Sequence, residues 1–166
     1  MRSFPVDALA AIGGLDREQV EELVGDPGFP VYAAARSGAD RLFVAPDLFN
    51  IGLAGALHRL GLNLFAIRDV VVSLGACEID AQGWPSEMFP GQRREKFTPA
   101  LIVVRPVGSA FAASLVSPSE LWAAIAAYDA GASLVVDATA LAERIARAVE
   151  EAGAPLLLPK RGPSLL

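Results

Sequence analysis

The sequence predicts an α+β protein in which four helices and a β-hairpin are followed by a smaller ββαβα module. Three observations support this fold class. Of the 166 residues, 53% are hydrophobic and 20% are charged, so the chain can bury a core as one ordinary domain or two small ones. Apolar residues recur at helical spacing through most of the chain. Short β-rich runs bounded by glycine or proline interrupt them.

Two short helices open the chain. The first is expected over residues 5–12 and ends at Gly13, because a glycine pair stops the apolar periodicity there. The second begins at Asp16, whose carboxylate can cap the helix, and Gln19 three residues later completes a capping box. Pro27 cannot continue a helical ladder and marks the end. Two short helices joined by a glycine turn predict a helix-turn-helix unit.

Two short extended segments follow, over residues 29–34 and 41–44. Between them lies a polar connection, residues 35–40, with Gly38 near its middle. This arrangement predicts a β-hairpin that projects from the helices as a wing.

Two longer helices complete the first unit. One is expected over residues 46–60, with Pro46 in its first turn and Gly61 after its end. Asn63 can cap the next helix, which ends at Gly75. The inward face of this last helix repeats at intervals of three, four and three residues: Leu64, Ile67, Val71 and Leu74.

A segment rich in proline and glycine over residues 76–97 is interpreted as a linker or covering loop. Arg93, Arg94 and Lys96 form a basic cluster in it, either as part of a partner-binding surface or as an ordinary solvated loop. The predicted organisation is a first unit over 1–75, the linker over 76–97, a second unit over 98–154 and a tail over 155–166.

The second unit is predicted as strand, strand, helix, strand, helix. Its strands are expected over residues 100–105, 110–116 and 133–136. Ser117 can cap the first of its helices and Asp137 the second.

The first helix of the second unit carries aromatic residues at helical spacing. Together with Leu121 and Ile125, the side chains of Trp122 and Tyr128 are expected to pack in the core. An effector pocket beside these two aromatic rings is the alternative interpretation.

Composition excludes several kinds of function. A net charge of -5 argues against a broad cationic surface for nucleic acid or anionic lipid. Because Cys77 is the one cysteine and His58 the one histidine, the chain can form neither an internal disulfide nor a cysteine/histidine zinc cage. We therefore expect no catalytic residues, no metal ligands and no cofactor, and the protein is predicted not to be an enzyme.

No apolar run reaches the roughly 18 residues of a membrane span, and no signal peptide is recognisable. These observations predict a cytoplasmic protein without membrane contact. The high apolar content also favours an oligomer, most simply a homodimer.

The first unit resembles the winged helix-turn-helix domain of the MerR family of transcription regulators. The resemblance covers somewhat under half of the chain. It rests on an ordered series of short motifs: Gly14-Leu15-Asp16, Gly38-Ala39-Asp40-Arg41-Leu42-Phe43, Asp47-Leu48, Leu57-His58-Arg59-Leu60-Gly61, and Leu64, Ile67 and Arg68.

The resemblance implies a dimeric DNA-binding regulator with its second helix in the major groove. Arg17 and Gln19 would then approach base edges. The wing would lie along the phosphate backbone. Its expected contact residues are Arg36, Ser37, Arg41 and Phe43. The family's long dimerising helix is replaced here by the linker, so the second unit is expected to supply the dimer contact.

The second helix departs from the family pattern, because Glu21 and Glu22 stand where an arginine and an aromatic residue are usual. Residues 1–75 hold six basic and nine acidic side chains, a net charge of -3. Like charges facing phosphates are unfavourable at short range. The alternative hypothesis is therefore a protein-interaction adaptor, of the kind found among phage accessory factors, whose winged helix has lost most of its affinity for DNA.

Overall fold

The structure is a computed structural model that describes residues 4–31, 35–37, 40–43, 45–74, 99–127 and 131–151. The described residues form an α+β fold with six α-helices and two three-stranded antiparallel sheets. The helices are α1 (Val6–Gly13), α2 (Arg17–Gly25), α3 (Ala45–Arg59), α4 (Leu64–Leu74), α5 (Leu121–Ala126) and α6 (Ala138–Glu151). The strands are β1 (Phe4–Pro5), β2 (Ala35–Ser37), β3 (Asp40–Phe43), β4 (Leu101–Val107), β5 (Ala110–Val116) and β6 (Leu134–Asp137).

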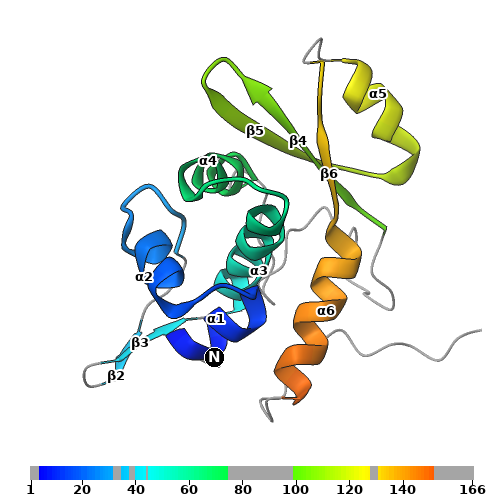
Figure 1. The fold of residues 1–166 in the computed structure, drawn as a ribbon. Coiled ribbons are helices and arrows are strands. Elements are labelled where there is room, and N and C mark those ends of the chain that lie inside the picture. Colours follow the sequence, from blue (N-terminus) through cyan, green and yellow to red (C-terminus); the bar gives the residue numbers. More distant parts are fainter. Residues whose placement is uncertain are drawn as a thin grey trace, which may run out of the picture.

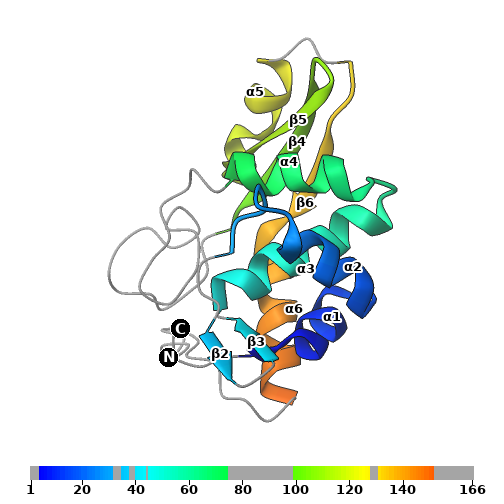
Figure 2. The same cartoon turned by 90° about the vertical axis from the view of Figure 1, so that its left-hand side faces the viewer.

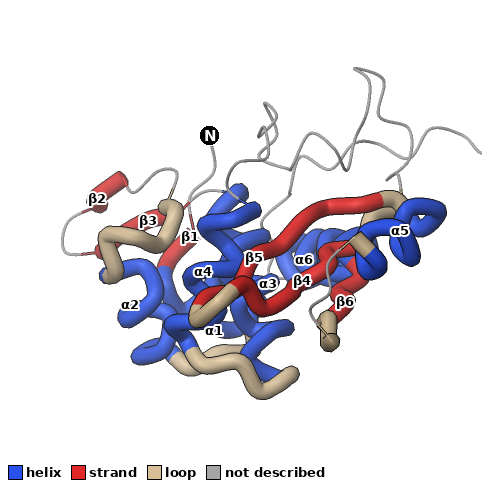
Figure 3. Tube along the Cα trace, turned by 90° about the horizontal axis from the view of Figure 1, so that it is seen from above, coloured by secondary structure: helices blue, strands red, loops and turns tan. Residues whose placement is uncertain are grey.

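The N-terminal helices gather at one end of the molecule and the sheet of β4, β5 and β6 lies at the other (Figure 1). Helix α6 runs back from this sheet along α3 and α1 (Figure 2). Seen from above, the β2–β3 hairpin and α5 lie at opposite ends of the molecule (Figure 3). The expected helices are thus all present, and the order β4, β5, α5, β6, α6 confirms the predicted ββαβα module.

The local sequence signals at the ends of the first helices are confirmed by the structure. Gly14 ends α1 in the left-handed conformation (φ 66°), and its N–H donates to the carbonyl of Ala10 at 2.9 Å. Asp16 and Gln19 form the predicted capping box at the start of α2. Farther along, the Oδ1 atom of Asn63 accepts a hydrogen bond from the N–H of Ala66 at 2.9 Å, as expected for the cap of α4.

The hairpin is displaced from its predicted position. Strand β2 lies inside residues 35–40, the segment expected to connect two strands, while residues 29–31 form no strand. The remainder of that predicted strand, residues 32–34, lies outside the described part of the chain. Phe29 does not belong to a sheet. It packs in the hydrophobic core, where it is 4% exposed. The prediction of a strand over 29–31 was therefore wrong.

A third strand joins this hairpin. Strand β1 pairs antiparallel with β3, so that Phe4 lies opposite Phe43 and the sheet has the order β1-β3-β2. Both phenylalanines are buried. The chain start is thereby tied to the base of the hairpin, a contact that two residues of strand are too short to reveal from sequence.

Helix α3 packs closely against two other helices through glycine. A Cβ atom on Gly55 would collide with the carbonyl oxygen of Gly13 at the end of α1. One on Gly52 would lie 2.5 Å from the Cδ1 atom of Ile145 on α6. The absence of side chains at these two positions lets α1 and α6 approach the α3 backbone.

One hydrophobic core spans both predicted units. Its buried members include Leu9, Ile51 and Ile67 from the first unit, together with Ile102 and Ile145 from the second. The predicted linker, residues 76–97, lies outside the described residues, and the division into domains stays a prediction. The shared core means that the two units support each other energetically.

A serine closes the outer edge of the second sheet. The hydroxyl of Ser73, in the last turn of α4, donates to the carbonyl of Ala113 at 3.1 Å and accepts from its N–H at 2.9 Å. Ala113 pairs with Val104 of β4 on its other side. Ser73 thus occupies the place of a neighbouring strand at this point of β5.

The expected burial of Trp122 was wrong, because its side chain is 77% exposed. Helix α5 has only six residues and covers the sheet through the half-buried side chains of Leu121 and Ile125. Position 122 follows Leu121 directly and therefore points to another side of the helix. Tyr128, the other aromatic residue of this prediction, lies outside the described residues.

Candidate interaction surface

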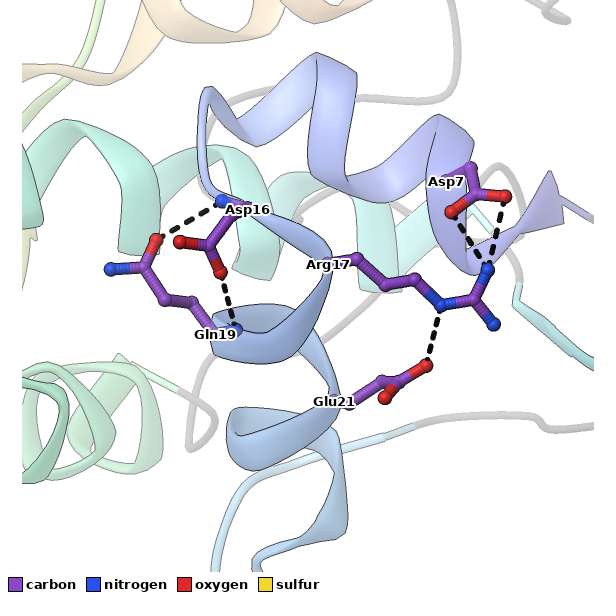
Figure 4. A network of polar contacts seen from close by, with 5 residues as sticks. All are labelled: Asp7, Asp16, Arg17, Gln19 and Glu21. Atoms are coloured by element: carbon purple, nitrogen blue, oxygen red, sulfur yellow. Dashed lines mark hydrogen bonds and ion pairs between the residues drawn. The ribbon is translucent and has the colours of Figure 1, made fainter.

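The guanidinium of Arg17, one of the two predicted base-reading groups, is held between two carboxylates (Figure 4). Its Nη1 atom lies 3.0 Å from Oδ1 and 3.2 Å from Oδ2 of Asp7 on α1. Its Nε atom lies 2.7 Å from Oε1 of Glu21, one turn farther along α2. The hydrogen bond to Glu21 and the charge of Asp7 raise the pKa of Arg17 above its ordinary value. All three side chains are more than half exposed, so this network lies on the surface.

Gln19, the second predicted base-reading group, is engaged within the protein through both ends of its amide. Its Oε1 atom accepts from the N–H of Asp16 at 3.0 Å. Its Nε2 atom lies 3.1 Å from Nε2 of His58 on α3. The Nδ1 atom of that histidine lies 3.3 Å from the carbonyl oxygen of Leu62. A neutral His58 protonated at Nδ1 satisfies both of these contacts, a tautomer assigned from the network.

The solvent-facing side of α2 is acidic. Glu18, Glu21 and Glu22 are all exposed, and the one basic side chain of this helix is Arg17. Because two carboxylates neutralise Arg17, the surface that α2 offers to a partner carries net negative charge. Such a surface attracts cationic groups and repels phosphates.

A second ion pair fixes the C-terminal end of α2. The carboxylate of Asp26 accepts from the N–H of Gly28 at 2.7 Å and from Nη1 of Arg68 on α4 at 3.2 Å. The hydrogen bond from Gly28 is the main cause that lowers the pKa of Asp26, and Arg68 contributes. The guanidinium of Arg68 also stacks 4.1 Å from the ring centroid of Phe65. The ion pair between Asp26 and Arg68 anchors the end of α2 against α4.

The structure places the predicted wing residues in the β2–β3 hairpin. In its register Arg36 lies opposite Arg41, and Ser37 lies opposite Asp40. Phe43 differs from the others, because its side chain is fully buried. It packs in the core and supports the hairpin from within.

Two contacts that define this surface were missed from the sequence. Asp7 lies ten residues before Arg17, and His58 lies 39 residues after Gln19, so neither pairing has a local spacing signal. The acidic first turn of α1 was visible in the sequence, but its proximity to α2 depends on how the two helices cross.

The helices of the described segments are all too short or too polar to cross a bilayer. Within those segments, no three histidine, cysteine, aspartate or glutamate side chains are grouped in a way that could hold a metal ion. No protein-family model matches the chain, and no curated protein matches its sequence.

Proposed function

We propose that this chain is a non-enzymatic protein-interaction adaptor with a winged helix-turn-helix layout, and that α2 binds a basic protein surface. The order α1, α2, hairpin, α3, α4 supports the layout. The observation that carries the proposal is the double ion pair of Arg17 with Asp7 and Glu21. It neutralises much of the charge of the one basic side chain of α2 and so weakens its attraction for phosphates.

The second predicted groove contact is also occupied. For Gln19 to reach a base, its amide would have to leave both the N–H of Asp16 and the ring of His58. The hydrogen bond from the N–H of Asp16 alone contributes about 0.5–1.5 kcal/mol net. A single base contact contributes about 1–3 kcal/mol of discrimination, so much of that gain would be offset. Glu18 and Glu22, which are exposed on the same helix, remain available to attract cationic groups on a partner.

Binding of a synthetic lysine-rich peptide at low ionic strength tests the proposal. The variant E18Q/E22Q removes two exposed charges from α2 and leaves the pair of Arg17 with Glu21 intact. We expect its affinity for the peptide to fall at least about threefold, since an exposed ion pair contributes roughly 0.5 kcal/mol. The measurement is a fluorescence-anisotropy titration.

The matched control is E143Q/E151Q, which removes the same charge from α6. It should bind the peptide like the unaltered protein if α2 is the interaction surface. Equal losses in both variants would mean that the peptide responds to net charge alone, and the proposal would fail.

DNA binding through the hairpin is a second candidate function. The observation in its favour is the register that sets Arg36 opposite Arg41. Arginine is well suited to hydrogen-bond phosphate groups, and this register brings two arginines to one position of the hairpin. The charge reversal R41E should then abolish any binding to random duplex DNA, whereas unchanged binding would exclude the hairpin as the contact. Association as a homodimer also stays a prediction, testable by analytical ultracentrifugation.

A further inference from the structure

Helix α6 carries an arginine with no counter-charge among the described residues. Arg144 directly precedes Ile145, whose side chain packs against Gly52 of α3. Its Nε and Nη2 atoms are buried and have no hydrogen-bond partner. A buried cationic group without a partner is costly, because it has lost water and gained nothing in its place.

The charged residue that affects the pKa of Arg144 is a second arginine, Arg59. Burial, together with the positive charge of Arg59 at the end of α3, lowers the pKa of Arg144. Arg59 is held in place, because its Nη1 atom donates to the carbonyl of Gly13 at 3.1 Å. The end of α3 therefore adds to the positive charge that acts on Arg144 and does not compensate it.

No carboxylate of the described residues forms an ion pair with either arginine. Along α6, Glu143 is the residue before Arg144, but the side chains of adjacent helical residues do not face each other. Arg144 as a whole is partly exposed, although its Nε and Nη2 atoms are buried. An external group can therefore approach this side chain from solvent.

We propose that Arg144 is a binding site for an anionic group, a phosphate or a carboxylate, where α6 packs against α3, and that the positive charge of Arg59 adds to the attraction. An anion would supply the counter-charge that both arginines lack and would offset their mutual repulsion. The planar fork of arginine matches the geometry of either group. The site uses α3 and α6 instead of α2, so it is independent of the proposed function.

Thermal unfolding of the full chain in different salts tests this site. At constant ionic strength, chloride is replaced stepwise by inorganic phosphate or by acetate. Once the anion concentration exceeds the dissociation constant, each further tenfold increase in free anion concentration should raise Tm by about 3–6 °C. A response to phosphate alone identifies a phosphate group as the ligand chemistry, and a response to acetate identifies a carboxylate.

Three variants decide whether Arg144 is responsible. R144M should unfold in chloride at the same or a higher Tm than the unaltered protein, because it removes an uncompensated charge, and its Tm should not respond to either anion. R144K keeps the charge but not the fork, and should show a smaller response. R147M, which alters an exposed arginine of the same helix, should respond in full. Absence of a specific response in the unaltered protein, or an equal loss in R147M, would overturn the proposal.

Discussion

The side-chain amide of Gln19 lies 3.1 Å from the imidazole of His58, and this contact joins α2 to α3. Because the same amide also completes the capping box of α2, one side chain both starts the helix and fixes its position. A residue that resembles a base-reading group in the sequence therefore has a structural role in the fold.

The first prediction concerns this amide. Gln19→Ala should lower the free energy of unfolding by about 1–2 kcal/mol, because it removes the capping bond to Asp16 and the contact with His58. Urea denaturation measures the change. Glu22→Ala, on the exposed side of the same helix, should change stability by less than about 0.5 kcal/mol. Equal effects of the two substitutions would contradict the role assigned to Gln19.

The close crossing of α1 and α3 gives the second prediction. Gly55→Ala should destabilise the protein by about 3 kcal/mol or more, because the new Cβ atom meets the backbone carbonyl of Gly13, which cannot move alone. Gly25→Ala is the control, since nothing lies within 4 Å of its added Cβ atom. It should be neutral or stabilise α2 by up to about 1 kcal/mol. A tolerated Gly55→Ala would show that the helices do not cross here.

Ser73 provides the third prediction, on the connection between the two units. Ser73→Ala removes both hydrogen bonds to Ala113 and should cost about 1–2 kcal/mol in the free energy of unfolding. Val72→Ala changes the neighbouring exposed side chain and should cost much less. Amide hydrogen exchange gives a more local readout: the N–H of Ala113 should lose protection in Ser73→Ala. Protection equal to that of the unaltered protein would contradict the contact.

The lowered pKa of Asp26 predicts how the free energy of unfolding changes with pH. Its pKa in the folded protein lies below the ordinary value of 3.8, so the unfolded chain binds more protons in the window beneath that value. The stabilisation is complete at neutral pH and is lost as the pH falls from about 4 through the lowered pKa. Asp26→Asn should lack this part of the acid dependence. Urea denaturation between pH 2 and pH 6 measures it, and parallel curves for the two proteins would contradict the assignment.

Local interactions made much of the fold predictable. The capping box of Asp16 and Gln19, the cap at Asn63 and the turn at Gly14 depend on neighbours within a few residues. The displaced hairpin shows where such signals end, because Phe29 is apolar on account of the core and β2 contains the polar residues Arg36 and Ser37. The sequence pattern alone does not distinguish an apolar residue that packs in the core outside any strand from one that belongs to a strand.

The candidate site was less predictable than the fold. Arg17 and Gln19 were predicted to approach base edges from α2, and the structure places Arg17 exposed and Gln19 half-buried on that helix. Their partners Asp7 and His58 come from other helices, so the sequence alone could not indicate that both groups were engaged. The acidic character of α2, by contrast, was evident from composition and underlies the function proposed above.

Release of Arg17 tests whether its ion pairs limit contact with DNA. The variant D7N/E21Q frees the guanidinium by removing two charges, and E18Q/E22Q removes the same charge without freeing it. We expect D7N/E21Q to bind random duplex DNA more tightly than E18Q/E22Q at low salt. Equal binding by the two variants would show that only net charge matters.

The most direct measurement of the central claim is a salt titration of the unaltered protein against random duplex DNA. The adaptor hypothesis predicts no measurable binding even at low salt, because α2 presents glutamates and a neutralised arginine. Binding whose affinity falls steeply with salt, with a slope equivalent to several phosphates, would contradict it and would establish a DNA-binding protein instead.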